Sequence, residues 1–136
     1  MEKTITIAGR SVTFKASGGI GYRYKAQFGR EFIADVTELE EFVNTGIVER
    51  IPKKNKNGKR IYIDGILQFE EKTTYDFTKF SLESMYNILW TMAKTADDSI
   101  PDPLTWLDSF DEFPVMDIFA QVKEILQANF KIAPKN

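Results

Sequence analysis

Seven carboxylates lie close together in the second half of the sequence, and they are the first residues to consider for chemistry. They fall between Lys94 and Lys123 with no Lys or Arg among them: Asp97, Asp98, Asp102, Asp108, Asp111, Glu112 and Asp117. Oxygen ligands suit Ca²⁺ or Mg²⁺. The spacing does not fit an EF-hand loop, because Asp97-Asp98 is followed by Ile100-Pro101 rather than by alternating ligands and a central Gly. Helix capping explains Asp102, and helix N-termini favour acids such as Asp111, so we expect no metal.

The chain contains no histidine and no cysteine, and this composition limits the chemistry further. Imidazole acid–base catalysis, thiol nucleophiles, thiolate zinc sites and disulfides are all excluded within it. A glycine-rich run at residues 17–21 precedes an expected helix, where backbone N–H groups can hold an anion. It lacks the Gly-Lys-Ser/Thr ending of a phosphate-binding loop, so we interpret it as a hinge. We therefore expect no enzyme, no cofactor and no small-molecule partner.

A basic segment occupies the middle of the chain. Residues 50–60 carry six cations and no acid: Arg50, Lys53, Lys54, Lys56, Lys59 and Arg60. Clustered Lys and Arg bind phosphate backbones regardless of base sequence, so a nucleic-acid-associated phage or bacterial protein using residues 50–60 is the alternative function. The formal net charge of −2, and the position of Tyr62 beside the run rather than within it, favour a solvated loop instead.

Three aromatic residues among the acids form the candidate binding site. Trp106, Phe110 and Phe113 occupy a segment too short to bury every face, and Asp111 lies between them. An apolar patch rimmed by charge is typical of a protein–protein interface. The alternative is that all three rings pack on neighbouring helices. We predict that Trp106, Phe110, Asp111 and Phe113 bind a partner, and we predict no catalytic, cofactor-binding or metal-binding residue.

The elements that must position these residues are predicted from the apolar periodicity, which indicates an α+β fold that is mostly helical. Alternation over residues 4–15 predicts an N-terminal β-hairpin with Gly9-Arg10 as its turn. A helical stripe with one apolar residue in every four is expected at Ile20, Tyr24, Phe28 and Phe32. Further helices are expected after an N-cap at Asp35 or Thr37, after N-caps at Ser81 and Asp102, and from Pro114, and three or four helices should pack on the hairpin. The helix after Ser81 has an expected apolar stripe of Leu82, Met85, Tyr86, Leu89, Met92, Ala93 and Ala96. The helix from Pro114 has one of Val115, Ile118, Phe119, Val122, Ile125 and Leu126. Leu89 and Ile118 are expected at the centre of these stripes.

The length of 136 residues predicts a single globular domain over residues 1–130. Within it we expect a basic hairpin or loop at about residues 49–62, followed at the end by a frayed tail at residues 131–136. No stretch approaches the ~18 consecutive apolar residues of a membrane span, and no signal-peptide pattern opens the chain. We expect a cytoplasmic protein without a membrane partner.

Two longer strings, found in order after the expected hairpin, carry a family resemblance. The first is residues 22–31 (YRYKAQFGRE), and the second is residues 89–97 (LWTMAKTAD), followed by Ile100-Pro101-Asp102-Pro103 and Trp106-Leu107. In this order they resemble the tail assembly chaperones of long-tailed (siphovirus-type) bacteriophages and prophages. The resemblance covers residues 1–35 and 81–126, and the basic segment lies outside it.

The resemblance implies a function in assembly rather than in catalysis. Such chaperones coat the tape measure protein in the cytoplasm of the host bacterium, help to recruit tail tube subunits, and are absent from the mature virion. The implied partners are thus the tape measure protein and the tail tube protein, whereas nucleic acid is not expected. A long helical client that cannot yet bury its apolar stripes needs temporary cover. The resemblance also implies a longer product made by ribosomal frameshifting near residues 133–136.

Overall fold

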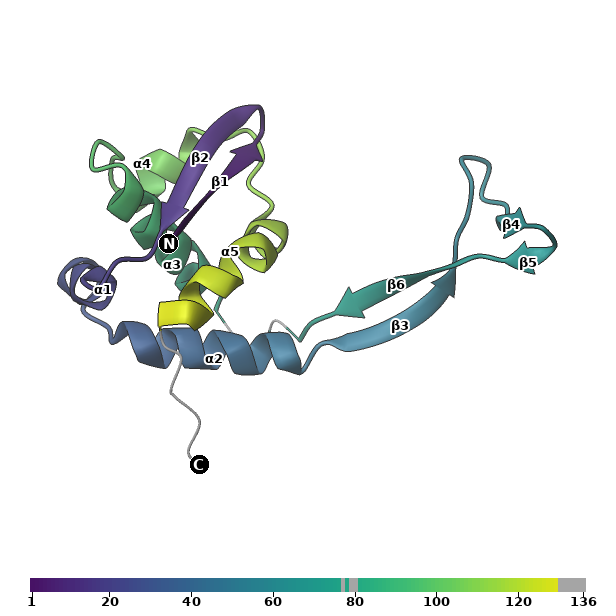
Figure 1. Cartoon of the computed structure of the whole chain (residues 1–136), viewed down its shortest axis with the longest axis horizontal. Coiled ribbons are helices and arrows are strands. Elements are labelled where there is room, and N and C mark those ends of the chain that lie inside the picture. The colour runs from purple at the N-terminus through teal and green to yellow at the C-terminus, as the bar shows by residue number, and fades with distance from the viewer. Residues whose placement is uncertain (77, 79–80, 130–136) are drawn as a thin grey trace. The chain divides into compact units, whose positions relative to one another are not determined.

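The computed structural model describes residues 1–76, 78 and 81–129, which form five helices and three two-stranded antiparallel sheets (Figure 1). The predicted α+β class is therefore confirmed. The chain divides into two compact units, one made of Met1–Leu39 and Ser81–Asn136 and the other of Glu40–Phe80. The second unit extends further on both sides than the arm expected at residues 49–62. The tail expected at residues 131–136, and the frameshift position within it, lie outside the described residues.

The first unit opens with a hairpin of β1 (Glu2–Ile7) and β2 (Arg10–Lys15). Its turn is Ala8-Gly9, and both residues have positive φ, as a type I′ turn requires. Arg10, expected in the turn, instead begins β2 opposite Ile7. The apolar alternation holds, because one face of the hairpin is buried through Ile5, Ile7, Val12 and Phe14.

Two helices replace the single apolar stripe expected from Ile20 to Phe32. α1 (Ile20–Phe28) ends at Gly29, whose left-handed φ of 70° lets its N–H bond back to the Lys25 carbonyl at 2.8 Å. α2 (Phe32–Asn44) then begins, and it runs from the first unit into the second. Asp35 was expected as an N-cap, but it lies in the first turn of α2 with its side chain buried.

The buried Asp35 carboxylate joins α1 to α2. The Tyr24 hydroxyl donates to Asp35 Oδ2 at 2.6 Å, and the Arg30 guanidinium donates to both oxygens, at 2.6 Å from Nη2 and 2.9 Å from Nε. The bonds from Arg30 hold the pKa of the Asp35 carboxyl below its usual range. Burial, with the neighbouring carboxylate, raises the pKa of the Tyr24 hydroxyl. All three groups thus keep one protonation state in the folded protein near neutral pH.

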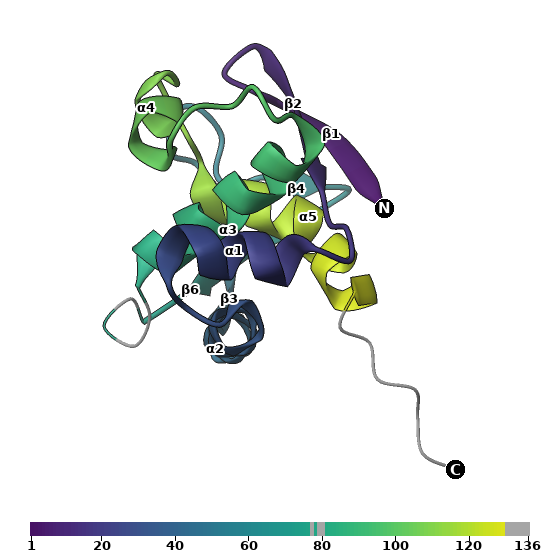
Figure 2. The same ribbon diagram turned by 90° about the vertical axis from the view of Figure 1, so that its left-hand side faces the viewer.

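Three further helices complete the first unit: α3 (Leu82–Ala96), α4 (Pro103–Asp108) and α5 (Val115–Asn129). Two predicted caps are confirmed, since Ser81 Oγ accepts from the Glu83 N–H and Asp102 accepts from the Thr105 N–H. α3 contacts β2, α1, α4 and α5, and α5 also contacts β1. Figure 2 shows α1 running beside α3. Five helices form where three or four were expected against the hairpin, and α3 and α5 are the ones that contact it most.

The second unit contains two short sheets. β3 (Ile47–Pro52) pairs with β6 (Phe69–Thr74), and between them β4 (Tyr62–Ile63) pairs with β5 (Ile66–Leu67). Phe42, at the end of α2, stacks on Tyr75 with ring centroids 5.3 Å apart. A side chain on Gly46 would place its Cβ 2.7 Å from the Tyr75 ring, so this close approach requires glycine.

Leu89 and Ile118 lie where the sequence predicts, with 0% and 1% of their surfaces exposed. Leu89→Ala should therefore lower the free energy of unfolding by about 2–5 kcal/mol, because it leaves a cavity in a packed core. Leu104→Ala is the matched control, since this leucine on α4 is 67% exposed, and it should cost less than about 0.5 kcal/mol. Urea melts of both variants measure the difference. Equal losses would contradict the central position of α3.

Removal of the Arg30 charge should expose the dependence of α1–α2 packing on Asp35. Arg30→Gln should lower the free energy of unfolding at pH 7 by more than the loss of an exposed ion pair does, because it leaves a buried carboxylate without its cation. Since the folded pKa of Asp35 is lowered, this contribution is present above pH ~4 and is lost as the pH falls further. Lys25→Gln breaks only the exposed pair with Glu31 and should cost less than about 1 kcal/mol. A gap between the variants that did not change between pH 7 and pH 3 would contradict this account.

Candidate partner-binding site

The predicted aromatic site is largely internal. Trp106 is 2% exposed and Phe110 is 7% exposed, and their rings meet edge to face at 5.3 Å. Phe113 is half-buried, and the centre of its ring lies 5.4 Å from the centre of the Trp106 ring, whereas Asp111 is exposed. The expectation of an exposed aromatic patch is thus corrected in favour of the packed alternative. The chain can bury these rings because it turns tightly after α4, where the Phe110 N–H bonds to the Leu107 carbonyl.

Arg10 covers this aromatic cluster from the β2 side. Its guanidinium carbon lies 4.0 Å from the centre of the Phe110 ring, at cation–π distance. Nη1 also donates to the carbonyl and the hydroxyl of Ser109, at 3.1 and 2.8 Å. Sequence reasoning missed this contact, because it placed Arg10 in the turn and because the two segments are far apart in the chain.

The acidic stretch has structural tasks. Asp97 Oδ1 accepts from the Ser99 hydroxyl and N–H, and these bonds lower the pKa of its carboxyl. Asp102 accepts from the Thr105 hydroxyl and N–H in the same way, again with a lowered pKa. Among the residues that the structure describes, no three acidic side chains are grouped so as to hold a metal ion. Hydrogen bonds that cap turns and helices account for Asp97 and Asp102.

The second unit presents a surface that the sequence had not singled out. Its stalk, defined as β3 and β6, is a two-stranded ribbon whose pairing runs from Ile47 opposite Thr74 to Pro52 opposite Phe69. The register places Glu49 opposite Lys72, a favourable cross-strand pair. Among the described residues of this unit, Phe42 is the only buried side chain. A two-stranded ribbon without a covered face is only marginally stable in water.

The stalk ends in a branch of two smaller loops. Three backbone hydrogen bonds form a cycle here. The Lys53 N–H donates to the Gln68 carbonyl at 2.9 Å, the Ile61 N–H to the Lys53 carbonyl at 3.0 Å, and the Gln68 N–H to the Ile61 carbonyl at 2.9 Å. This cycle of backbone hydrogen bonds ends the strand pairing of the stalk, and two separate segments extend from it. We call residues 53–60 the basic loop and residues 62–67 the apolar hairpin. A basic hairpin over residues 49–62 would require β3 to pair with the residues that follow the basic loop. β3 instead pairs with β6.

The basic loop is a charged turn held by hydrogen bonds. Asn55 organises it, because its Oδ1 accepts from the N–H groups of Asn57 and Lys59. Lys54 forms an isolated antiparallel bridge with Arg60. Every residue of the loop is exposed, and it displays five cations: Lys53, Lys54, Lys56, Lys59 and Arg60. This geometry agrees with the solvated loop that the sequence favoured.

The apolar hairpin lies on the other branch. Its turn is Asp64-Gly65, with φ of 51° and 79°, and it pairs Tyr62 with Leu67 and Ile63 with Ile66. Tyr62, Ile63 and Ile66 are each more than half exposed. Six of the eleven large apolar side chains exposed in the described part of the chain belong to the second unit. Exposed apolar side chains gathered on one small element mark a binding surface.

No family model matches the chain, and no curated protein or solved structure is significantly similar to it. Among the described residues, no helix has both the length and the apolar character needed to cross a membrane. The assignment of function therefore depends on the surfaces themselves and on the resemblance described above.

The aromatic cluster and the stalk should respond differently to loss of an aromatic ring. Phe110→Ser removes a buried ring that contacts Trp106 and Arg10, so it should cost about 3–5 kcal/mol of unfolding free energy. Phe69→Ser removes a ring on β6 that is 37% exposed and contacts the Arg50 guanidinium, and it should cost less than about 1 kcal/mol. Denaturant titration followed by far-UV circular dichroism measures both, since both tryptophans lie in the first unit and do not report on the stalk. Retention of full stability by Phe110→Ser would restore the interpretation of this cluster as a free binding patch.

Proposed function

We propose that this chain is a tail assembly chaperone of a long-tailed bacteriophage or prophage. In this proposal it acts in the cytoplasm of the host bacterium, binds the tape measure protein, helps to recruit tail tube subunits, and is absent from the mature virion. The observation that carries the proposal is the uncovered second unit with its exposed apolar hairpin. The resemblance of residues 22–31 and 89–107 to this class of chaperone supports the choice of client.

The apolar hairpin suits a helical client. Ile63 and Ile66 are paired across the hairpin, so their exposed side chains lie on one face and form a small apolar surface that the apolar stripe of a helix can cover. Tyr62 and Leu67 lie on the other face. Each such side chain contributes roughly 1.5–3 kcal/mol when it is fully buried, before the cost of association is subtracted. A few such contacts along a long client give reversible binding, which a chaperone needs because it must leave.

The proposal includes no catalytic step. The chain has no His or Cys, and the carboxyl groups with lowered pKa, namely those of Asp35, Asp97 and Asp102, are engaged in structural hydrogen bonds. The predicted site at Trp106, Phe110 and Phe113 is replaced by the apolar hairpin as the principal client surface, since a buried ring cannot bind without unfolding its surroundings.

The exposed basic loop favours a second candidate function, the binding of nucleic acid. Five cations on one loop supply affinity for a phosphate backbone, and this affinity falls steeply as salt is raised. Contacts between apolar side chains do not weaken in this way. The two functions therefore differ in their salt dependence.

The double variant Ile63→Ser/Ile66→Ser should abolish co-purification of the chain with a co-expressed fragment of the tape measure protein. Both side chains are exposed, so the circular dichroism spectrum should stay unchanged. Leu104→Ser is the control, because it removes an equally exposed leucine from α4 and should leave co-purification intact.

The salt dependence of the complex distinguishes binding of the tape measure protein from binding of nucleic acid. The complex should survive a rise from about 50 to 200 mM salt, over which nucleic-acid binding by several cations would weaken by orders of magnitude. The proposal is contradicted if the Ile63→Ser/Ile66→Ser variant still forms the complex. It is also contradicted if Lys54→Ser/Lys56→Ser abolishes both the complex and the binding of nucleic acid.

A further inference from the structure

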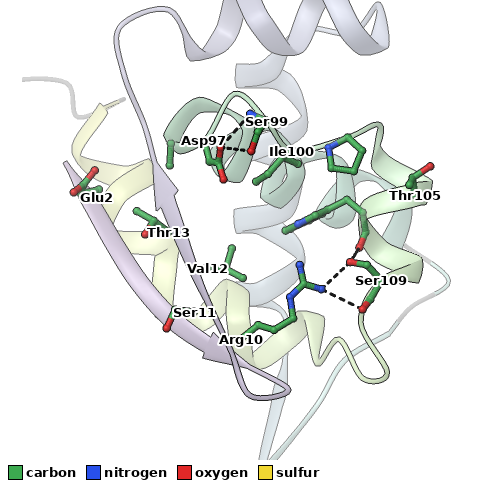
Figure 3. Close-up of a pocket in the computed structure, with 13 residues that line it drawn as sticks. Glu2, Arg10, Ser11, Val12, Thr13, Asp97, Ser99, Ile100, Thr105 and Ser109 are labelled. Carbon is green, nitrogen blue, oxygen red and sulfur yellow. Dashed lines mark hydrogen bonds between the residues drawn. The ribbon is translucent and has the colours of Figure 1, made fainter.

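A groove of about 600 Å³ lies within the first unit, along the free edge of β2 (Figure 3). Ser11, Val12 and Thr13 line it on the strand side, and Asp97, Ile100 and Ser109 line it on the opposite side. Trp106 also contributes to its lining. The groove is separate from the apolar hairpin, and its function is independent of the chaperone proposal.

The hairpin register leaves backbone groups of β2 directed into this groove. In a hairpin with a two-residue turn the pair next to the turn, here Ile7 and Arg10, exchanges hydrogen bonds, and every second pair does the same. The bond from the Ala16 N–H to the Met1 carbonyl, at 3.2 Å, follows this alternation. Ser11 and Thr13 belong to the other pairs, so their N–H and C=O groups face away from β1. In the described part of the chain, neither forms a backbone hydrogen bond to another segment.

The wall opposite β2 is held in place, so the groove does not depend on a ligand to form. The Trp90 indole N–H donates to the Pro101 carbonyl at 2.8 Å, and the Lys94 ammonium donates to the Ile100 carbonyl at 2.7 Å. At the other end of the groove Arg10 holds Ser109 through two bonds. A groove with fixed walls and free edge groups is a preformed site for an added β-strand.

The two ends of the groove carry opposite charges. Arg10 lies at the turn end, where its guanidinium contacts two uncharged groups, Ser109 and the Phe110 ring. Asp97 and Ser99 lie toward the other end (Figure 3). Between them Val12 points to the same face of the hairpin as Arg10, where the partly exposed Ile100 adds apolar surface.

We propose that this groove binds an extended peptide segment of a partner protein, which pairs antiparallel with β2 as a third strand. The peptide residues opposite Ser11 and Thr13 accept hydrogen bonds from the two free N–H groups of these residues and donate hydrogen bonds to their two free C=O groups. The side chain opposite Val12 is apolar, the one beside Arg10 is acidic, and the one toward Asp97 is basic. Antiparallel pairing is the more stable arrangement per residue and sets the direction of the segment.

A pair of capped peptides tests the pattern on the full chain. Acetyl-Lys-Thr-Val-Thr-Glu-amide matches it, and acetyl-Glu-Thr-Val-Thr-Lys-amide has the same composition with the charges exchanged. Titration followed by amide NMR should shift the Ser11 and Thr13 signals, and the exchanged peptide should bind about fivefold more weakly or worse. The proposal is wrong if the matched peptide leaves these signals unmoved, or if the exchanged peptide binds equally well or better.

Two proline variants locate the binding edge. Ser11→Pro removes an outward N–H from the groove edge, and Thr6→Pro removes the equivalent group from the outer edge of β1, opposite Ser11 in the register. Ser11→Pro should weaken binding of the matched peptide about fivefold or more, and Thr6→Pro should not. Equal effects would overturn the proposal. If Ser11→Pro fails to fold, Arg10→Gln decides, because it should reduce the preference for the matched peptide over the exchanged one, and an unchanged preference would overturn the proposal.

Discussion

A helix that is packed on several sides must satisfy its polar side chains without water, and this constraint shapes the first unit. α3 contacts β2, α1, α4 and α5, and from Ile88 to Ala93 every side chain is buried. The Thr91 hydroxyl meets the requirement by donating to the Asn87 carbonyl at 2.7 Å. The Trp90 indole meets it by donating to Pro101, and the same bond fixes the loop that follows the helix. The groove wall along β2 is thus a consequence of how α3 is buried.

The elements with one apolar face could be predicted from the sequence. In α5 the expected positions are all buried, from Val115 to Leu126, because a helix at the margin of a core shows its buried stripe directly in its periodicity. The hairpin face of Ile5 and Phe14 was predicted for the same reason. Ser81 and Asp102 were identified as caps because their chemistry is local.

The features that depend on distant parts of the chain could not be predicted. Ile88 and Trp90 fall outside the stripe expected for α3, since a helix buried on several sides has no single apolar face. The pairing of β3 with β6 joins segments separated by two short turns, and periodicity carries no information on such partners. The site residue Phe110 was expected on the surface because its cover, Arg10, comes from the other end of the sequence. The tendency of Asp35 to cap a helix was overridden by Tyr24 and Arg30.

The branch at the end of the stalk gives the second unit an architecture in which two recognition elements can diverge separately. Each begins and ends next to the same closed cycle of backbone bonds between Lys53, Ile61 and Gln68. Because the entropy of closing a loop rises only slowly with its length, residues can be gained or lost at Gly58 or Gly65 without shifting the stalk register. The basic loop and the apolar hairpin can therefore each change in length and sequence, in evolution or by protein engineering, while the strand pairing of the stalk stays the same.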